Sequence, residues 1–363
     1  MVCTSCFTYN HAPYIVDAMN GFTMQQTTFP VITCIVDDAS TDGEPEVIRQ
    51  YLTDHFQAPY RVEETDDYQL ICANHNTNTY CTFAVFLLKY NHHSIKKSKI
   101  LYVQELRRSS KYIAICEGDD YWIHPKKLQM QVDYMEENVA CVLTHTAFEY
   151  REEGIGSKMD AKRITKTNIR LLQLNKDIRP YILDGNAYLV QTMTAMFRTE
   201  AGERVAIDLK EYQGKFQMGD TQLWVALISL GKVYFFDEVT SIYRLHRNSA
   251  THQPTVADKL RFQLSCSEMR VALAEKYLLS AEYINRFRKQ YNWTLTEYLW
   301  LNRSYQPFIP PCYDSIKEKI IYGILQSRYV GFFAKRIYLS KKMKVFTSKA
   351  MLKMNPFKPR EHF

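Results

Sequence analysis

The sequence predicts an α/β protein with a doubly wound sheet, in which buried strands alternate with helices that cover both faces. Residues 31–36 form a continuous β-branched and apolar run, which is typical of a parallel strand buried on both faces. Helical patterns lie on either side of this run, at 14–26 and from Pro45 onward. Acidic residues follow two strand-like runs directly, and ligands of such sheets bind beyond the carboxyl ends of the strands. The pattern therefore predicts a fold class and the sheet edge at which a ligand binds.

Turn signals and periodicity divide the first 150 residues into alternating elements. Residues 2–8 alternate between apolar and polar side chains and end in the turn 9–13. Pro45 stands near the first turn of the second helix, where a missing N–H removes no helical hydrogen bond. Residues 55–110 are polar and weakly patterned apart from a helical stretch at 102–109. The predicted elements are strands at 2–8, 31–36, 111–116 and 140–148, and helices at 14–26, 45–54, 102–109 and 125–137.

The pattern of the following residues is weaker until a helical C-terminal part begins. Residues 151–185 are charged and lack apolar periodicity, so we expect a long connection or a flap there. A strand is expected at 188–197, an apolar helix at 219–230 and a further strand at 232–236. Beyond Thr255 the pattern is helical throughout, and no internal repeat is evident.

The composition excludes several classes of protein. Of the 363 residues, 46% are hydrophobic and 23% are charged, which is typical of a globular chain rather than a disordered one. Gly and Pro number only 12 each, which excludes collagen-like and low-complexity chains. The nine cysteines are mostly single within apolar runs, which predicts reduced thiols in a cytoplasmic protein. No run of about 18 apolar residues predicts a helix that crosses a membrane.

Two carboxylate pairs follow predicted strands. Asp37 and Asp38 end the second strand, and Asp119 and Asp120 lie just after the third. Like charges this close destabilise one another unless a cation or hydrogen-bond donors offset them. Helix capping is an alternative explanation for the first pair, but the second pair lies several residues before Pro125, where the next helix is expected. Two pairs at one edge suggest a divalent metal, and hard oxygen ligands favour Mg²⁺ or Mn²⁺ over zinc.

Five short motifs occur in order along the chain. They are Phe-Thr-Tyr-Asn at 7–10, Asp-Asp-Ala-Ser-Thr-Asp at 37–42, Glu-Gly-Asp-Asp-Tyr-Trp at 117–122, Gly-Asp-x-x-Leu-Trp at 219–224 and Tyr-Arg-x-His-x-x-Ser at 243–249. In this order they resemble the family 2 glycosyltransferases of the kind that build bacterial polysaccharides. The resemblance covers about residues 1–252, and it implies a GT-A fold and inverting transfer from a nucleoside-diphosphate sugar to a glycan or lipid-linked acceptor. The domains implied are a GT-A catalytic domain at 1–252, with a nucleotide-sugar half at 1–125 and an acceptor half at 126–252, and a helical basic extension at 253–363.

The resemblance also implies roles for single residues. Asp220 stands at the position of the catalytic base, which accepts the proton of the acceptor hydroxyl. Asp120 is expected to hold the cation, Mg²⁺ or Mn²⁺, with Asp119 and His246 as further ligands. The residues expected to bind the nucleotide sugar are Phe7, Thr8, Tyr9, Asp37, Asp38, Asp119 and Arg244.

The chain departs from the family pattern at two places. Many members have Asp-Ser where this chain has Glu117 and Gly118, and Glu-Asp where it has Gly219 and Asp220. The second departure keeps the carboxylate at the base position. The first changes the neighbours of the expected metal ligands, so it bears on how the roles are divided among them.

Two other functional classes are weaker interpretations. A nucleotidyltransferase that makes sugar nucleotides would usually carry a Gly-rich basic loop after the first strand, whereas the turn 9–13 contains no glycine. A non-catalytic carbohydrate-binding protein of the same fold is disfavoured because all the motif carboxylates are present.

The C-terminal residues are strongly basic. Residues 315–363 contain 12 Lys or Arg and 2 Asp or Glu, a local charge of +10, so the rest of the chain carries 7 − 10 = −3. Apolar residues are mixed with these charges, as in amphipathic helices that bind anionic membranes. A charged helix packed on the catalytic domain is the alternative, and nucleic acid is a weaker explanation because no recognition motif accompanies the charge. We therefore expect a cytoplasmic protein that can bind the inner face of the cell membrane, with no nucleic-acid partner.

Other conspicuous side chains are expected to have structural or solvated roles. Trp122 and Trp224 lie in apolar surroundings and are more often core aromatics than sugar platforms. The basic clusters at 96–99 and 107–108 are typical of solvated helix faces, and no role is assigned to them.

Overall fold

The computed structural model describes residues 1–152, 177–185, 189–246, 255–301 and 305–313, with single residues between 316 and 323. Contacts among the described residues divide the chain into two compact units. The first unit comprises Met1–Gln213 and Met218–His252, and the second comprises Gly214–Gln217 and Gln253–Phe363.

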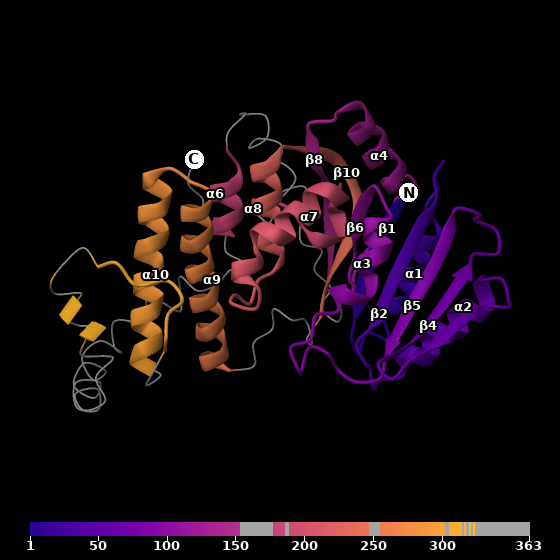
Figure 1. Ribbon diagram of the computed structural model, residues 1–363, viewed down its shortest axis with the longest axis horizontal. Helices are drawn as coiled ribbons and strands as arrows, with labels where there is room; N and C mark the ends of the chain where they lie inside the picture. Colours follow the sequence, from indigo (N-terminus) through magenta and orange to yellow (C-terminus); the bar gives the residue numbers. More distant parts are fainter. Residues whose placement is uncertain are drawn as a thin grey trace. The chain divides into compact units, whose positions relative to one another are not determined.

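A mixed sheet forms the centre of the first unit, as Figure 1 shows. Its described strands are β1 (Val2–Thr8), β2 (Val31–Asp37), β3 (Arg61–Glu64), β4 (Tyr68–Asn74), β5 (Cys81–Leu88), β6 (Tyr112–Ile115), β7 (Tyr121–Trp122), β8 (Cys141–Glu152), β9 (Met196–Arg198) and β10 (Lys232–Leu245). They lie in the order β3-β4-β5-β2-β1-β6-β9-β8-β10-β7. The strands β5, β2, β1 and β6 run parallel in the middle, whereas β3 and β4 form an antiparallel edge. The strands β8 and β10 are parallel to each other, and β9 and β7 are antiparallel to their neighbours.

Helices cover both faces of the parallel strands. The described helices of the first unit are α1 (Ile15–Thr23), α2 (Glu44–His55), α3 (Ile100–Arg108), α4 (Lys127–Glu137), α6 (Arg179–Asp184), α7 (Thr199–Asp208) and α8 (Asp220–Leu230). One core cluster joins Ile35 of β2 to Ile15 of α1 and Ile48 of α2. Cys34, the residue before Ile35 in β2, belongs to a second cluster together with Val103 of α3. Because successive strand residues point to opposite faces, α3 packs on the face that α1 and α2 leave uncovered. The predicted α/β class with a covered mixed sheet is confirmed.

The sheet contains a central strand that the sequence pattern did not predict. Residues 81–88, expected to be weakly patterned, form β5, which is almost completely buried and pairs with β2 and β4. Its sequence, Cys-Thr-Phe-Ala-Val-Phe-Leu-Leu, is a continuous apolar run with one threonine, so the signal for a buried strand was present. The edge strand Arg61–Glu64 is exposed along its whole length, and it therefore lacks the alternation that marks a strand in a sequence.

Two expectations in the second half of the first unit are corrected. In the described part of the strand predicted at 188–197, only Met196 and Phe197 belong to a strand, β9, which continues to Arg198, and a short 3₁₀ turn, Thr192–Thr194, precedes it. The strand predicted at 232–236 continues to Leu245, so Tyr243 and Arg244 of the fifth motif lie within the sheet, while residues 247–249 of that motif lie outside the described residues. The helix α6 occupies part of the predicted flap, and the remainder of that flap at 153–176 lies outside the described residues.

Several side chains have the structural roles expected of them. Trp122 and Trp224 are buried, which confirms that they pack in the core. All nine cysteines are free thiols, as predicted. Among the helices that the structure describes, none combines the length and the apolar character needed to cross a bilayer.

The described part of the second unit consists mainly of two long helices, α9 (Val256–Lys276) and α10 (Ala281–Leu301). The buried carboxylate of Glu268 in α9 accepts hydrogen bonds from the Tyr305 hydroxyl, at 2.7 Å, and from the backbone N–H of Ile309, at 2.8 Å. These bonds attach the segment after α10 to α9. The prediction of helices beyond Thr255 is confirmed for α9 and α10, and most of the basic residues after 315 lie outside the described part.

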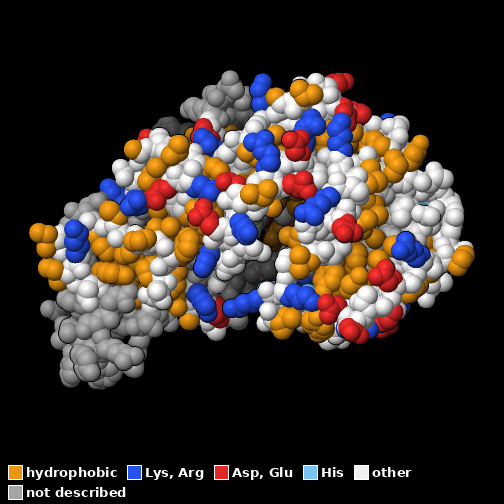
Figure 2. Space-filling model, viewed as in Figure 1, with side chains coloured by type: hydrophobic (Ala, Val, Ile, Leu, Met, Phe, Trp, Pro, Cys, Tyr) orange, Lys and Arg blue, Asp and Glu red, His pale blue; other side chains and the backbone are white. Residues whose placement is uncertain are grey.

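Charges of both signs occur on the surface. Basic and acidic side chains are both spread over the described part of the face in Figure 2. This mixture agrees with the small net charge of −3 that remains once residues 315–363 are set aside.

Candidate functional site

The predicted site residues gather at the carboxyl edge of the parallel strands. Thr8 is the last residue of β1 and Asp37 the last of β2, while Glu117 comes two residues after β6. These strands are direct neighbours in the sheet and run in the same direction, so the residues that follow them meet at one edge. The sequence prediction of a shared ligand edge is consistent with this arrangement.

Three side chains at this edge could hold a metal ion. One ligand atom from each of His11, Asp119 and His246 lies within 4.8 Å of the other two. The Nε2 atom of His246 is 3.0 Å from Oδ2 of Asp119, and Nε2 of His11 is 3.8 Å from the same oxygen. Burial tends to raise the pKa of Asp119, but the hydrogen bond to His246 and the neighbouring imidazoles hold that pKa below its usual value. Two imidazoles and an ionised carboxylate are a donor set that a divalent transition metal fits.

Asp120 does not belong to this cluster. Its side chain is 3% exposed, and its Oδ1 accepts a hydrogen bond from the backbone N–H of Arg244 at 2.8 Å. Burial raises the pKa of Asp120 well above its usual value, and the charges of Asp119 and Glu117 raise it further. The sequence analysis expected Asp120 to be the main metal ligand, whereas the structure brings its neighbour Asp119 to the two histidines. Adjacent residues of an extended turn point in different directions, so only one of the pair reaches the cluster.

Arg244 is held by protein groups on all sides. Its Nε donates to the carbonyl of Asp119 at 2.9 Å, and its Nη2 pairs with the carboxylate of Asp17 in α1 at 2.6 Å. The guanidinium also lies 4.6 Å from the ring centre of Tyr14 and 5.1 Å from that of Tyr121. These contacts connect Arg244 to the turn that carries Asp119, and its expected contact with the nucleotide sugar stays a prediction.

Phe7 and Asp38, two of the residues expected to bind the nucleotide sugar, lie beside basic side chains. The ring centre of Phe7 lies 5.9 Å from Nζ of Lys99 and 5.8 Å from the guanidinium carbon of Arg107. Nζ of Lys99 also donates to Oδ2 of Asp38 at 2.9 Å. These two basic side chains therefore contact protein groups and do not lie on the fully solvated helix faces that the sequence analysis expected. The sequence alone could not place them beside Phe7, because they are distant from it in the chain: Lys99 precedes α3 and Arg107 lies within α3.

Asp38 is a buried anchor for the loop that follows β5. The backbone N–H groups of His92 and His93 donate to its two oxygens, at 2.6 and 3.1 Å. Burial tends to raise the pKa of Asp38, but the hydrogen bonds from Lys99 and from these backbone groups keep it lower than usual. The carboxylate therefore stays charged while it holds the loop against the sheet. Tyr9, the last of the predicted nucleobase residues, is 42% exposed.

A buried glutamate that the sequence analysis did not single out joins the loops after β1 and β2. The carboxylate of Glu44, the first residue of α2, accepts hydrogen bonds from the Thr8 hydroxyl at 2.5 Å, the Ser40 hydroxyl at 2.9 Å and the backbone N–H of His11 at 2.8 Å. Burial raises the pKa of Glu44, and these three donors oppose that effect. The only signal in the sequence was its place just before Pro45 at the start of a helix.

Asp37 is the most poorly paired carboxylate of the predicted set. It is 1% exposed, and its Oδ2 accepts one hydrogen bond from the backbone N–H of Ser40 at 3.1 Å. Its Oδ1 is buried without a hydrogen-bond partner among the described residues. Burial accordingly raises the pKa of Asp37 to about 6, despite the bond from Ser40.

Asp220 and Glu117 are two further carboxylates of the site. Asp220 is the first residue of α8, and its Oδ1 accepts the backbone N–H of Thr221 at 2.7 Å, while Gly219 occupies the cap position. Burial raises the pKa of Asp220. Burial also raises the pKa of Glu117 to about 7, against a hydrogen bond donated by the Thr192 hydroxyl at 2.7 Å, and the charges of Asp119 and Asp220 contribute to the increase. The charge of Asp220 thus affects Glu117, a carboxylate that the sequence analysis did not assign to the site.

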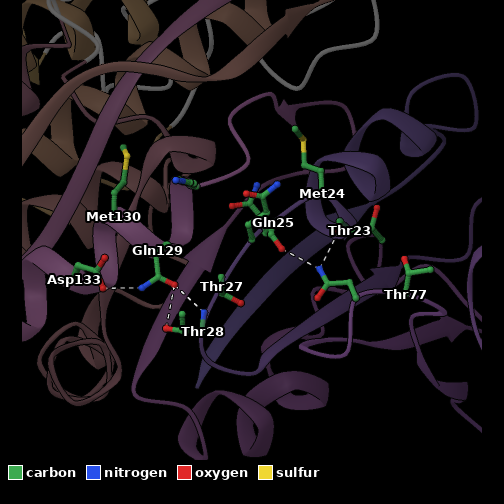
Figure 3. A pocket seen from close by; sticks show the side chains of 12 residues that line it. Thr23, Met24, Gln25, Thr27, Thr28, Thr77, Gln129, Met130 and Asp133 are labelled. Carbon is green, nitrogen blue, oxygen red and sulfur yellow. Dashed lines mark hydrogen bonds between the residues drawn. The ribbon is translucent and has the colours of Figure 1, made fainter.

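A separate groove in the first unit contains none of these residues. Figure 3 shows it between the end of α1 and the start of α4, with a volume of about 720 Å³. Gln129 of α4 lines it, and its side-chain oxygen accepts from the backbone N–H of Thr28 while its amide donates to the carboxylate of Asp133. The Gln129 side chain therefore connects α4 to the loop after α1 through the backbone N–H of Thr28.

Comparisons with known proteins give partial likenesses. No family model matches the chain. An uncharacterized protein of Mycobacterium tuberculosis and one of Mycobacterium bovis are each 33% identical to it over 128 residues, which is 35% of this chain and 29% of theirs. The match therefore spans less than a third of the length of these relatives.

Two solved structures are similar over most of the chain. Staphylococcus aureus TarS 1–349 in complex with UDP covers 84% of this chain and 73% of its own, with a TM-score of 0.42 and 13% identity. The mannosyltransferase PcManGT from Pyrobaculum calidifontis, in complex with GDP-Man and Mn²⁺, covers 96% of this chain and 83% of its own, with a TM-score of 0.46 and 12% identity. Likenesses at this level carry no functional conclusion for this chain.

Proposed function

We propose that this chain is a GT-A glycosyltransferase that moves a sugar from a nucleoside-diphosphate sugar to a hydroxyl group of a glycan or lipid-linked acceptor, with inversion at the anomeric carbon. The observation that carries the proposal is the meeting, at one edge of a parallel sheet, of a metal-ligand cluster and two half-buried carboxylates whose pKa values are raised. The cluster is formed by His11, Asp119 and His246, and the carboxylates are those of Glu117 and Asp220. The order of the five sequence motifs supports the same reaction.

The metal would be held by Asp119 together with His246, whose Nε2 lies 3.0 Å from its Oδ2. When bound, a divalent cation offsets the negative charge that builds up on a departing diphosphate. The contacts of Arg244 support this use of the site, because its Nε donates to the carbonyl of Asp119 and its backbone N–H donates to the carboxylate of Asp120. The carboxylate of Asp119 is thereby held in one position before any ligand arrives.

The nucleotide would bind beside Phe7. Its aromatic ring offers a stacking face for a base, and the nearby ammonium of Lys99 and guanidinium of Arg107 supply positive charge. Asp38 keeps Lys99 in place through its ion pair. The unpaired oxygen of Asp37 is buried, so no contact with the nucleotide is assigned to it.

Asp220 would act as the general base. A sugar hydroxyl is a weak nucleophile at neutral pH, so a carboxylate within hydrogen-bond reach accepts its proton as the oxygen attacks the anomeric carbon. The new bond forms between that oxygen and the anomeric carbon while the bond from the anomeric carbon to the diphosphate oxygen breaks. Attack from the face opposite the diphosphate inverts the centre. Burial of Asp220 raises its pKa, which makes the carboxylate a stronger base.

The experiment is a screen of nucleotides and nucleotide sugars with the full chain. Thermal shift with nucleoside diphosphates, with and without Mn²⁺, identifies the base, and mass spectrometry then follows transfer to glycan acceptors. Asp119→Asn should abolish the metal-dependent shift. Asp66→Asn, which changes an exposed aspartate at a β-turn, is the matched control. If no nucleotide stabilises the parent protein at any metal concentration, the proposal is wrong.

The same screen separates the alternative reactions. A nucleotidyltransferase would release pyrophosphate from a nucleoside triphosphate and a sugar phosphate. A non-catalytic binding protein would show a shift with a sugar or nucleotide and no turnover.

We also propose that the basic residues after 315 bind an anionic membrane surface, where a lipid-linked acceptor would be found. Their local charge of +10 supplies the attraction. The full chain should sediment with vesicles containing phosphatidylglycerol at low salt and be released at high salt. Replacing Lys341, Lys342 and Lys344 with Gln should weaken this binding, and equal sedimentation with neutral vesicles would contradict the proposal.

A further inference from the structure

A chain of hydrogen bonds runs from Glu44 through Thr8 to His11. The Thr8 hydroxyl donates to Oε1 of Glu44 at 2.5 Å, and its oxygen lies 3.1 Å from Nδ1 of His11. The other oxygen of Glu44 accepts from the backbone N–H of His11 at 2.8 Å. The same carboxylate therefore fixes the backbone of His11 directly and its ring through Thr8.

This chain determines which ring nitrogen of His11 carries the proton. A hydroxyl has one proton, and Thr8 gives it to the carboxylate of Glu44, so the contact with His11 has to be an Nδ1–H donating to the hydroxyl oxygen. The neutral ring then has its lone pair on Nε2, the atom that faces Oδ2 of Asp119 at 3.8 Å. A carboxylate that orients a histidine through a hydrogen bond to its other nitrogen is the usual outer support of a metal-bound imidazole.

Gly118 provides an independent sign that this arrangement is built into the fold. A Cβ atom at this position would lie 2.1 Å from Oγ1 of Thr8 and 3.2 Å from Nδ1 of His11. Any other residue would therefore push on the two atoms that form the Thr8–His11 bond. This gives a physical reason for the departure from the family pattern at this position, because the tight approach leaves no room for a side chain.

We infer that His11 is a third metal ligand beside Asp119 and His246, that Thr8 and Glu44 are its positioning residues, and that the resulting centre takes Mn²⁺, Co²⁺ or Zn²⁺ in preference to Mg²⁺. Imidazole nitrogen suits these transition metals, whereas Mg²⁺ prefers oxygen ligands and keeps most of its water. The inference rests on the metal centre of the proposed function and does not depend on sugar transfer.

The first test measures Mn²⁺ binding to the full chain by calorimetry, with the metal alone. His11→Ala should weaken binding by more than about tenfold, and Thr8→Val, which keeps the shape but removes the hydroxyl, by about 10- to 100-fold. Thr8→Ser restores the hydroxyl and should bind within a few-fold of the parent. His55→Ala, an exposed histidine at the end of α2, is the control. If His11→Ala and Thr8→Val bind Mn²⁺ like the parent, the inference is wrong.

The second test reads the protonation of His11 directly. In metal-free protein labelled with ¹⁵N-histidine, the signal lost in His11→Ala should report a proton on Nδ1. Glu44→Gln offers an amide donor to Thr8, so the hydroxyl proton turns toward the ring and the signal should change to a proton on Nε2. A proton on Nε2 in the parent protein would overturn the inference even if metal binding were altered. Should Glu44→Gln fail to fold, Thr8→Val provides the same comparison, because removal of the hydroxyl frees the tautomer.

The third test concerns the choice of metal. A hundredfold excess of Mg²⁺ should leave Mn²⁺ bound in the parent and displace it from His11→Ala. Displacement from both would contradict the selectivity. All three tests are made without nucleotide or sugar, so their results do not depend on the proposed reaction. In the separate transfer assay, intact Mn²⁺ binding with no turnover would refute only the proposed reaction. Mn²⁺-dependent turnover that His11→Ala does not change would refute only the role of His11.

Discussion

Ionisation of Asp37 should make the first unit less stable as the pH rises. The carboxyl group is 1% exposed and receives one backbone hydrogen bond, and burial raises its pKa from the ordinary 3.8 to about 6. Between these two values the folded chain binds more protons than the unfolded chain, so stability falls as the pH rises and is constant again above pH 6. The difference between 3.8 and about 6, at about 1.4 kcal/mol for each pH unit, amounts to about 3 kcal/mol.

Asp37→Asn removes this dependence because an amide does not ionise. About half of the effect, roughly 1.5 kcal/mol, falls between pH 5 and pH 8. The free energy of unfolding of Asp37→Asn minus that of the parent should therefore be larger at pH 8 than at pH 5 by this amount. For a unit of this size, that gain corresponds to a relative increase in melting temperature of about 3–6 °C.

The comparison between two pH values is what makes the measurement decisive. An amide leaves an NH₂ group poorly paired, which costs about 1–3 kcal/mol, but this cost is the same at both pH values and cancels in the comparison. Calorimetric melting of parent, Asp37→Asn and the exposed control Asp66→Asn at pH 5 and pH 8 measures the effect. Parallel pH profiles for parent and Asp37→Asn would refute the reasoning, because they would mean that Asp37 is solvated or paired when folded.

Three further substitutions test the site. Asp220→Asn should keep nucleotide binding and lower transfer by about 10²–10⁴-fold, because the amide cannot accept a proton, and near-parental turnover would exclude Asp220 as the base. Gly118→Ala should weaken Mn²⁺ binding, measured by calorimetry, because the added methyl group displaces the Thr8 hydroxyl, and unchanged affinity would show that the neighbouring loop moves away easily. Arg244→Lys should weaken Mn²⁺ binding while nucleotide binding without metal persists, because one ammonium cannot replace the contacts with both Asp17 and the carbonyl of Asp119. A loss of metal-free nucleotide binding would instead indicate that Arg244 contacts the nucleotide directly.

Much of the fold follows from local patterns in the sequence. The strands at Val2–Thr8 and Val31–Asp37 and the helix at Asp220–Leu230 are marked by apolar runs and by the residues that end them. The exposed edge strand at Arg61–Glu64 has no such mark, since its pairing with β4 rather than its own side chains makes it a strand. The apolar run at Cys81–Leu88 was a signal that the prediction did not use.

The sequence alone determined that acidic residues follow neighbouring parallel strands, and this is enough to predict a ligand edge. Tertiary structure decided which of them meet. Asp119 and Asp120 are adjacent and identical in type, yet one faces two histidines and the other lies buried against the backbone of Arg244. His11 follows the first strand of the unit and His246 follows its last, and only the sheet order brings both to Asp119. Residue type and spacing determine which chemical groups follow each strand, but the direction of each side chain depends on partners that are distant in the sequence.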